Sequence, residues 1–69
     1  MPHEAVKYFI EIFEKKDNPF FKAAILRALS DLGTPEAMDF IKKSLNSEEN
    51  IVRMKAKEIL RKKGLMDDE

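Results

Sequence analysis

The chain has 69 residues, a length that predicts one small domain. It contains no cysteine, and its 13 basic and 13 acidic side chains cancel, so we exclude a disulfide framework, a cysteine-ligated zinc site, and a net charge that would draw the whole molecule to nucleic acid or anionic lipid. The longest uncharged run is too short to span a bilayer and no signal-peptide pattern opens the chain, so we expect a cytoplasmic protein without a membrane segment.

The first predicted helix runs from about Glu4 to Lys16. Its apolar side chains recur at the spacing of one helix face: Val6, Phe9, Ile10 and Phe13. Three further residues widen this face on one side: Ala5, Tyr8 and Ile12. The apolar arc then covers roughly 200° of the helix, which is wide for a surface helix.

The second predicted helix runs from Pro19 to about Leu32. Asn18 is a good N-cap, Pro19 suits the first helical position, and Gly33 ends the helix. The expected core stripe consists of Phe21, Ile25, Ala28, Leu29 and Leu32, with Ala24 and Leu26 at its flanks.

The third predicted helix restarts at once and runs to about Leu45. Thr34 caps it, Pro35 occupies its first turn, and Glu36 complements its dipole. Its inward side chains are predicted to be Ala37, Phe40, Ile41, Ser44 and Leu45, with Met38 at the edge. We expect Ser44 to hydrogen-bond within its own helix.

The fourth predicted helix runs from about Glu48 to Lys63, after a break capped by Ser47, and Gly64 ends it. Its apolar stripe is narrow: Val52, Ala56, Ile59 and Leu60. No segment alternates with the period of a strand. The predicted fold class is therefore all-α, with four helices that are antiparallel to their chain neighbours because the connections are short.

The second half of the chain repeats the first. Gly64 lies 31 residues after Gly33, and the same shift places Leu29 on Leu60. A shift of 32 residues places Glu4-Ala5-Val6 on Glu36-Ala37-Met38. A helix pair that recurs at this period is typical of an α-solenoid.

The stretch from Asn18 to Gly33, continued by Thr34-Pro35-Glu36-Ala37-Met38, resembles the short HEAT-like repeats of the phycobilisome-lyase type. The stretch from Glu49 to Gly64 resembles a second, more divergent copy of this repeat. It keeps the Val-Arg pair of the repeat pattern, as Val52-Arg53, but has no proline at the start of the helix. The resemblance implies two HEAT-like helix pairs, about 3–33 and 34–64, in a single domain of residues 1–64. An acidic flexible tail, 65–69, is expected to follow. The family uses this repeat for unrelated tasks, so the resemblance names no specific function.

One basic side chain lies near the start of the second helix of each pair. We expect Lys22 and Arg53 to reach back to acidic or amide groups of the preceding turn, Asp17-Asn18 and Glu48-Glu49 respectively. These contacts are predicted to stabilise the fold.

The sequence shows no combination of residues that is typical of a catalytic site. The only histidine, His3, lies at the N-terminus, and Thr34 and Ser47 are explained as caps. No phosphate-binding loop, metal-ligand spacing or apolar setting for a carboxyl acid appears. We therefore expect no enzyme activity, no cofactor and no metal.

The most informative surface is the outer face of the second and fourth helices. Seven residues are expected there and are the candidates for binding another protein: Phe20, Ala23, Arg27, Ile51, Met54, Glu58 and Arg61. Exposed Phe, Ile and Met side chains together can mark a contact patch. The alternative is that Phe20 and Ile51 fold down as hydrophobic staples. The predicted function is a non-catalytic interaction module or small scaffold.

Two other functions stay open. The fourth helix is basic, and Arg53, Lys57 and Arg61 are candidates for contacts with nucleic-acid phosphates. The resemblance also allows an accessory subunit of an enzyme, which would require a catalytic partner.

The wide apolar face of the first helix predicts a further contact. Two repeats are fewer than the usual minimum of about three, and Ala5, Tyr8 and Ile12 lie where a terminal repeat needs polar residues. We expect a homodimer or an upstream repeat to cover them. The abundance of Lys and Glu, with no Gln or Cys, also favours a thermophilic source.

Overall fold

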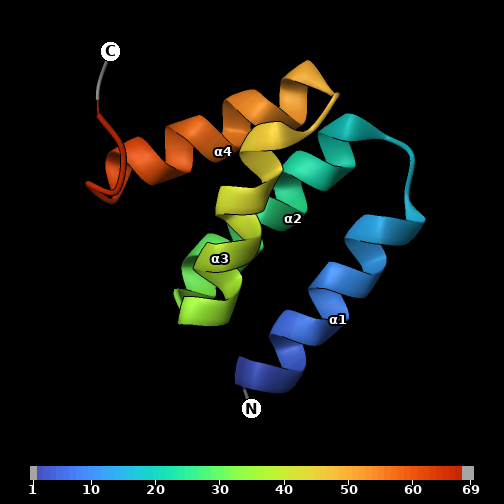
Figure 1. Cartoon of the computed structure of the whole chain (residues 1–69). Coiled ribbons are helices and arrows are strands. Elements are labelled where there is room, and N and C mark those ends of the chain that lie inside the picture. The colour runs from blue at the N-terminus through green and yellow to red at the C-terminus, as the bar shows by residue number, and fades with distance from the viewer. Residues whose placement is uncertain (1, 68–69) are drawn as a thin grey trace.

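A computed structural model describes residues 2–67 (Figure 1). Within this range the chain forms four α-helices, one short 3₁₀ helix and no strand, which confirms the predicted all-α class. The elements are α1 (Pro2–Lys15), α2 (Pro19–Leu32), α3 (Pro35–Lys43), η1 (Ser44–Asn46) and α4 (Asn50–Lys62).

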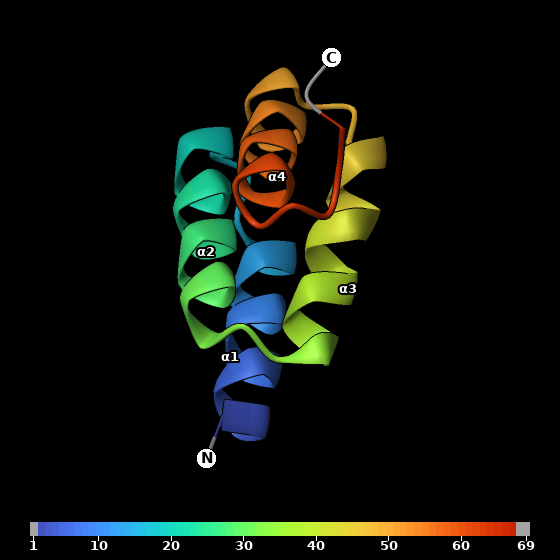
Figure 2. The same ribbon diagram turned by 90° about the vertical axis from the view of Figure 1, so that its left-hand side faces the viewer.

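The helices form two stacked pairs, α1 with α2 and α3 with α4 (Figures 1 and 2). Lys22 Nζ lies 3.0 Å from Glu49 Oε1, which joins the starts of α2 and α4. Lys63 Nζ donates a hydrogen bond to the Ser30 carbonyl at 3.0 Å, which joins their ends. α2 and α4 therefore run in the same direction side by side. His3 Nδ1 and Glu36 Oε1, 3.0 Å apart, connect the starts of α1 and α3 in the same way.

The joint between the two pairs is short and fixed by local chemistry. Gly33 adopts the left-handed conformation, with φ of 65°, and its N–H donates to the Leu29 carbonyl. Glycine has no Cβ to oppose this conformation. Thr34 Oγ1 accepts from the Ala37 N–H at 3.1 Å and Pro35 takes the first helical position. The predicted cap and stop are confirmed, and the joint is no flexible linker.

The other helix ends follow the sequence with small shifts. Asn18 Oδ1 accepts from the N–H groups of Phe20 and Phe21 at 2.8 and 3.3 Å, as expected of a cap. α1 begins at Pro2, earlier than predicted. α4 begins at Asn50 because Ser47 Oγ accepts from the Glu49 N–H in a turn before the helix.

The third predicted helix divides at Ser44, where the α-helix tightens into η1. Ser44 is buried, and its hydroxyl donates to the Phe40 carbonyl at 3.0 Å, one turn earlier, as predicted. A hydroxyl that bonds a carbonyl of the preceding turn often bends a helix.

The core lies between the pairs. Its largest fully buried side chains come from all four helices: Val6, Leu26, Leu29, Ile41, Val52 and Leu60. Phe13 and Phe40 cross this layer edge to face, with ring centroids 5.0 Å apart, and thereby pack α1 against α3.

Two predicted positions on α2 are wrong. Phe21 was expected in the core but is 44% exposed, and Ala23 was expected on the outer face but is buried. Ala23 and Ser30 are seven residues apart and share one side of the helix. Both residues are buried, so this side of α2 is covered. The small side chain of Ala23 therefore does not reach the outer surface. Ala24, expected at the flank of the core, is exposed.

The chain reverses direction after α4 (Figure 2). Gly64 has φ of 72°, and the N–H groups of Gly64 and Leu65 donate to the Arg61 and Leu60 carbonyls at 3.0 and 2.8 Å. These two bonds are those of a Schellman motif. Met66 then packs against the core. The last residues of the expected acidic tail, 68–69, lie outside the described residues.

Candidate protein-interaction surface

The outer sides of α2 and α4 form one surface, which we call the α2–α4 face: Phe20, Arg27, Ile51, Met54, Glu58 and Arg61. Phe20 is 69% exposed and Met54 is 66% exposed, whereas Ile51 is half-buried. Phe20 therefore does not fold down as a staple. Six of the seven predicted protein-binding residues reach this surface, and Ala23 does not because it is buried.

A shallow, open hollow runs along α4 within this face. Its lining has an apolar end, made by Ile51 and Met54, and a charged remainder, made by Lys55, Lys57, Glu58, Arg61 and Lys62. Sequence reasoning did not select Lys55 and Lys62. They stand four and eleven residues after Ile51, so the helical period alone would have placed them on its side of α4.

Glu58 lies at the centre of the charges in the hollow. Lys55 Nζ donates to its Oε1 at 2.7 Å, and Lys62 Nζ lies 3.9 Å from its Oε2. The hydrogen bond from Lys55 and the charge of Lys55 hold the pKa of Glu58 below its ordinary value, and Lys62 adds to this effect. The charge of Arg27, on α2, acts in the same direction, so the charges of the two helices influence each other across this face.

The three residues predicted to contact nucleic acid have different roles. Arg53 is half-buried, and its guanidinium donates to the Ser47 carbonyl at 2.7 Å and to Asn50 Oδ1. It reaches back as predicted, although to Ser47 and Asn50 instead of Glu48 and Glu49. Lys57 and Arg61 are exposed. Of the three residues predicted to contact nucleic acid, two are therefore exposed to solvent.

Lys22 does not make the predicted contact with Asp17 or Asn18. Its ammonium group crosses to Glu49 in the second helix pair and lies 5.4 Å from the centroid of the Phe13 ring. The prediction considered only the nearest residues in sequence, whereas the stacking of α2 beside α4 brings Glu49 within reach.

The predicted oligomer face on α1 is partly open. Tyr8 is 62% exposed, and Ala5 and Ile12 are half-buried. On the opposite flank of α1, a second shallow hollow lies against α3. It is lined by Ile10, Glu14, Glu36, Asp39, Phe40 and Lys43, and sequence reasoning did not select it.

Other kinds of site find no support in the described part of the chain. Residues 2–67 contain no group of three or more His, Cys, Asp or Glu side chains that could hold a metal ion. No buried polar side-chain atom among them lacks a hydrogen-bond partner. None of the helices in this range is long and apolar enough to cross a membrane.

Comparison with known proteins agrees with the fold. The family model described as HEAT repeats matches residues 1–61. The match does not distinguish the phycobilisome-lyase type from other HEAT repeats. No curated protein and no solved structure matches the chain. HEAT repeats are generally protein-interaction or scaffold modules and are typically non-catalytic. The chain belongs to the HEAT-repeat family.

Proposed function

We propose that this protein is a non-catalytic interaction module that binds a segment of another protein on the α2–α4 face. The observation that carries the proposal is the exposure of Phe20 on α2 and of Met54 on α4, where Met54 lines one hollow together with the half-buried Ile51. Large apolar side chains that gather on a surface favour contact with a partner, and the flexible thioether of Met adapts to varied shapes.

The charges around these residues define the chemistry of the partner. Four basic side chains line the hollow of α4 and Glu58 is the one acid among its lining residues. Two of those bases, Lys55 and Lys62, already lie beside Glu58, and Lys57 at the rim is exposed. A helical segment with acidic residues and one large apolar side chain complements this arrangement.

A selection from a displayed library of random peptides tests the proposal without a known partner. Peptides enriched on the immobilised protein are expected to be acidic and to carry a large apolar residue. Met54→Ser is expected to weaken their binding about tenfold or more, as removal of a central contact does. Leu65→Ser is the matched control, since Leu65 is also exposed but lies outside the face.

Enrichment of peptides without acidic residues, or equal binding by the Met54 and Leu65 variants, would contradict the proposal. Retention on heparin or duplex DNA tests the nucleic-acid alternative. Salt-dependent retention that disappears in a Lys57→Gln, Arg61→Gln variant would favour that alternative. A catalytic protein that co-purifies with the chain would instead favour the accessory-subunit prediction.

A further inference from the structure

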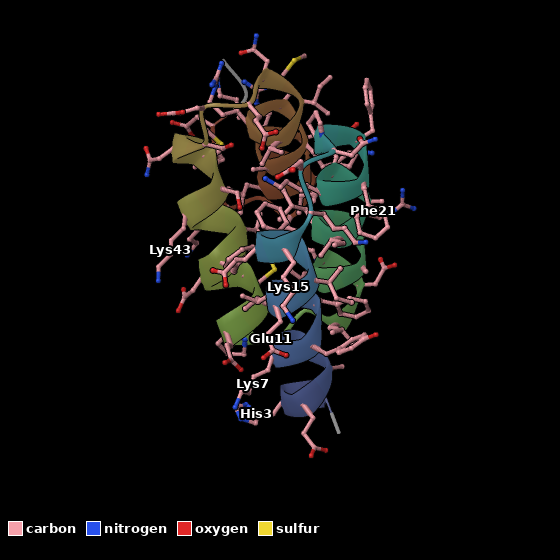
Figure 3. The ribbon with its side chains drawn as sticks, turned by 90° about the vertical axis from the view of Figure 1, so that its right-hand side faces the viewer. His3, Lys7, Glu11, Lys15, Phe21 and Lys43 are labelled. Atoms are coloured by element: carbon pink, nitrogen blue, oxygen red, sulfur yellow. The ribbon has the colours of Figure 1, made fainter. Side chains whose placement is uncertain are left out.

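A separate apolar surface lies where α1 meets the start of α2, and Figure 3 shows Phe21 on its α2 side. We call it the α1–α2 edge: Ala5, Tyr8, Ile12 and Phe21. Tyr8 and Phe21 are 62% and 44% exposed. Lys16 Nζ lies 5.7 Å from the centroid of the Phe21 ring, so the end of α1 and the start of α2 form one continuous surface. No other described element covers it.

The internal repeat shows which positions of the second helix pair correspond to the residues of this edge. The 32-residue shift places Tyr8 on Phe40, and Phe40 packs on Phe13 of the preceding pair at 5.0 Å. The 31-residue shift places Phe21 on Val52, which is fully buried. The positions that the second pair buries against the first are therefore exposed in the first pair. The α1–α2 edge is a stacking surface without a partner in the described chain.

The opposite end of the stack matches this apolar edge poorly. Lys42 stands two residues from Phe40, so it faces away from α1 on α3, and Lys57 and Arg61 are exposed on α4. Met66 packs against the core at this end. Stacking one copy on the next, head to tail, would place the apolar edge against a surface on which the exposed Met54 is accompanied by the charged groups of Lys57 and Arg61. A two-fold contact instead places each apolar edge against its own equivalent.

The charges on α1 suit such a two-fold contact. Glu4 and Lys15 are about three helical turns apart and share one flank of α1, with Tyr8 and Ile12 between them. Lys15 is labelled in Figure 3. Neither Glu4 nor Lys15 joins an ion pair among the described residues. Two antiparallel α1 helices that cross midway between Tyr8 and Ile12 bring Tyr8 against Ile12 of the second copy and Glu4 beside its Lys15.

We infer that the occupant of the α1–α2 edge is a second copy of this chain, bound about a two-fold axis that passes between Tyr8 and Ile12. The contact is distinct from the α2–α4 face, so the dimer presents two separate faces to partners. It also supplies the apolar burial that two short repeats lack on their own.

Sedimentation equilibrium across a range of concentrations tests the inference. The wild-type mass is expected to rise from 8.0 kDa toward twice that value. Lys15→Glu places like charges together at both ends of the contact and is expected to weaken the dimer about tenfold or more. The Glu4→Lys, Lys15→Glu double variant restores opposite charges and is expected to restore the dimer. Lys7→Glu, the same charge change outside the edge, leaves the mass unchanged.

Tyr8 gives a second measurement because it is the only tyrosine and the chain has no tryptophan. Dilution is expected to make its fluorescence more sensitive to acrylamide. A mass of 8.0 kDa at every concentration would overturn the inference. So would a dimer whose stability is the same in the wild type, in Lys15→Glu and in the Glu4→Lys, Lys15→Glu double variant. Either result would leave the edge to another helix pair or a different protein. Far-UV circular dichroism verifies that each variant is folded.

The dimer and the proposed function fail independently. Lys15→Glu is expected to keep peptide binding on the α2–α4 face, and Met54→Ser is expected to keep the dimer mass. A protein that binds peptides as a monomer would overturn only the dimer. A dimer that selects no peptide would overturn only the proposed function.

Discussion

The two ends of this short stack are built from equivalent helices and yet present opposite surfaces. At the C-terminal end, a Schellman turn reverses the chain, Met66 packs against the core, and exposed basic side chains line α4. At the N-terminal end, Tyr8 and Phe21 remain exposed. The buried side chains between the two pairs thus follow the repeat, whereas the side chains on the outer surfaces determine whether an end of the stack is polar or apolar. A terminal repeat normally requires a polar outer face, and only one end meets this requirement.

The largest expected effect comes from substitutions in the core that the two helix pairs share. Leu29 and Leu60 are equivalent under the repeat and are 0% and 1% exposed. Leu29→Ala and Leu60→Ala are each expected to lower the free energy of unfolding by about 2–5 kcal/mol, through lost apolar contact and the cavity left behind. Urea unfolding measures both. A loss well below this range at one position would mean that the pairs do not share one core.

A smaller effect separates the two ends at another equivalent pair. Val52 is fully buried and Phe21 is 44% exposed. Val52→Ala is expected to cost about 1.5–3 kcal/mol of unfolding free energy. Phe21→Ala is expected to cost less than about 1 kcal/mol in dilute solution, where the edge is uncovered. Equal costs at low concentration would show that the N-terminal edge is already closed within the monomer.

The smallest effect concerns the charges of α4. Lys55 and Lys62 lower the pKa of Glu58, so ionised Glu58 stabilises the fold above its ordinary pKa. This contribution is lost as the pH falls through the lowered folded-state value. Lys55→Gln is expected to raise the pKa of Glu58, measured by NMR titration of its side-chain carboxyl. Lys57→Gln is the control. An unchanged Glu58 pKa in the Lys55 variant would contradict the hydrogen bond of 2.7 Å between Lys55 and Glu58.

Local chemistry explains the parts of the fold that the sequence predicted well. Asn18, Gly33 and Thr34 cap or end helices through bonds to residues within a few positions, so their roles are visible without a tertiary structure. The same holds for Ser44, which bonds one turn back. The two helix pairs and their joint were therefore predictable.

The errors arose where packing between helices decides the outcome. A helical wheel cannot show which sides of α2 are covered, so Ala23 was placed outside. Phe21 was placed in the core because apolar spacing does not reveal whether a neighbouring helix exists on that side. Lys22 was assigned to its own turn, although the contact with Glu49 spans the two pairs. On the candidate surface, Phe20 and Met54 were predictable from the repeat, but the hollow that joins Lys55 and Lys62 to them was not.

The contrast between the two ends is tested most directly by two-dimensional NMR of the backbone amides as concentration rises from micromolar to millimolar. We expect the shifts to be confined to the α1–α2 edge, at Ala5, Tyr8, Ile12 and Phe21, while the amides of Met54, Lys57 and Arg61 on α4 stay unchanged. Shifts centred on α4, or no shift at any position over this range, would contradict it.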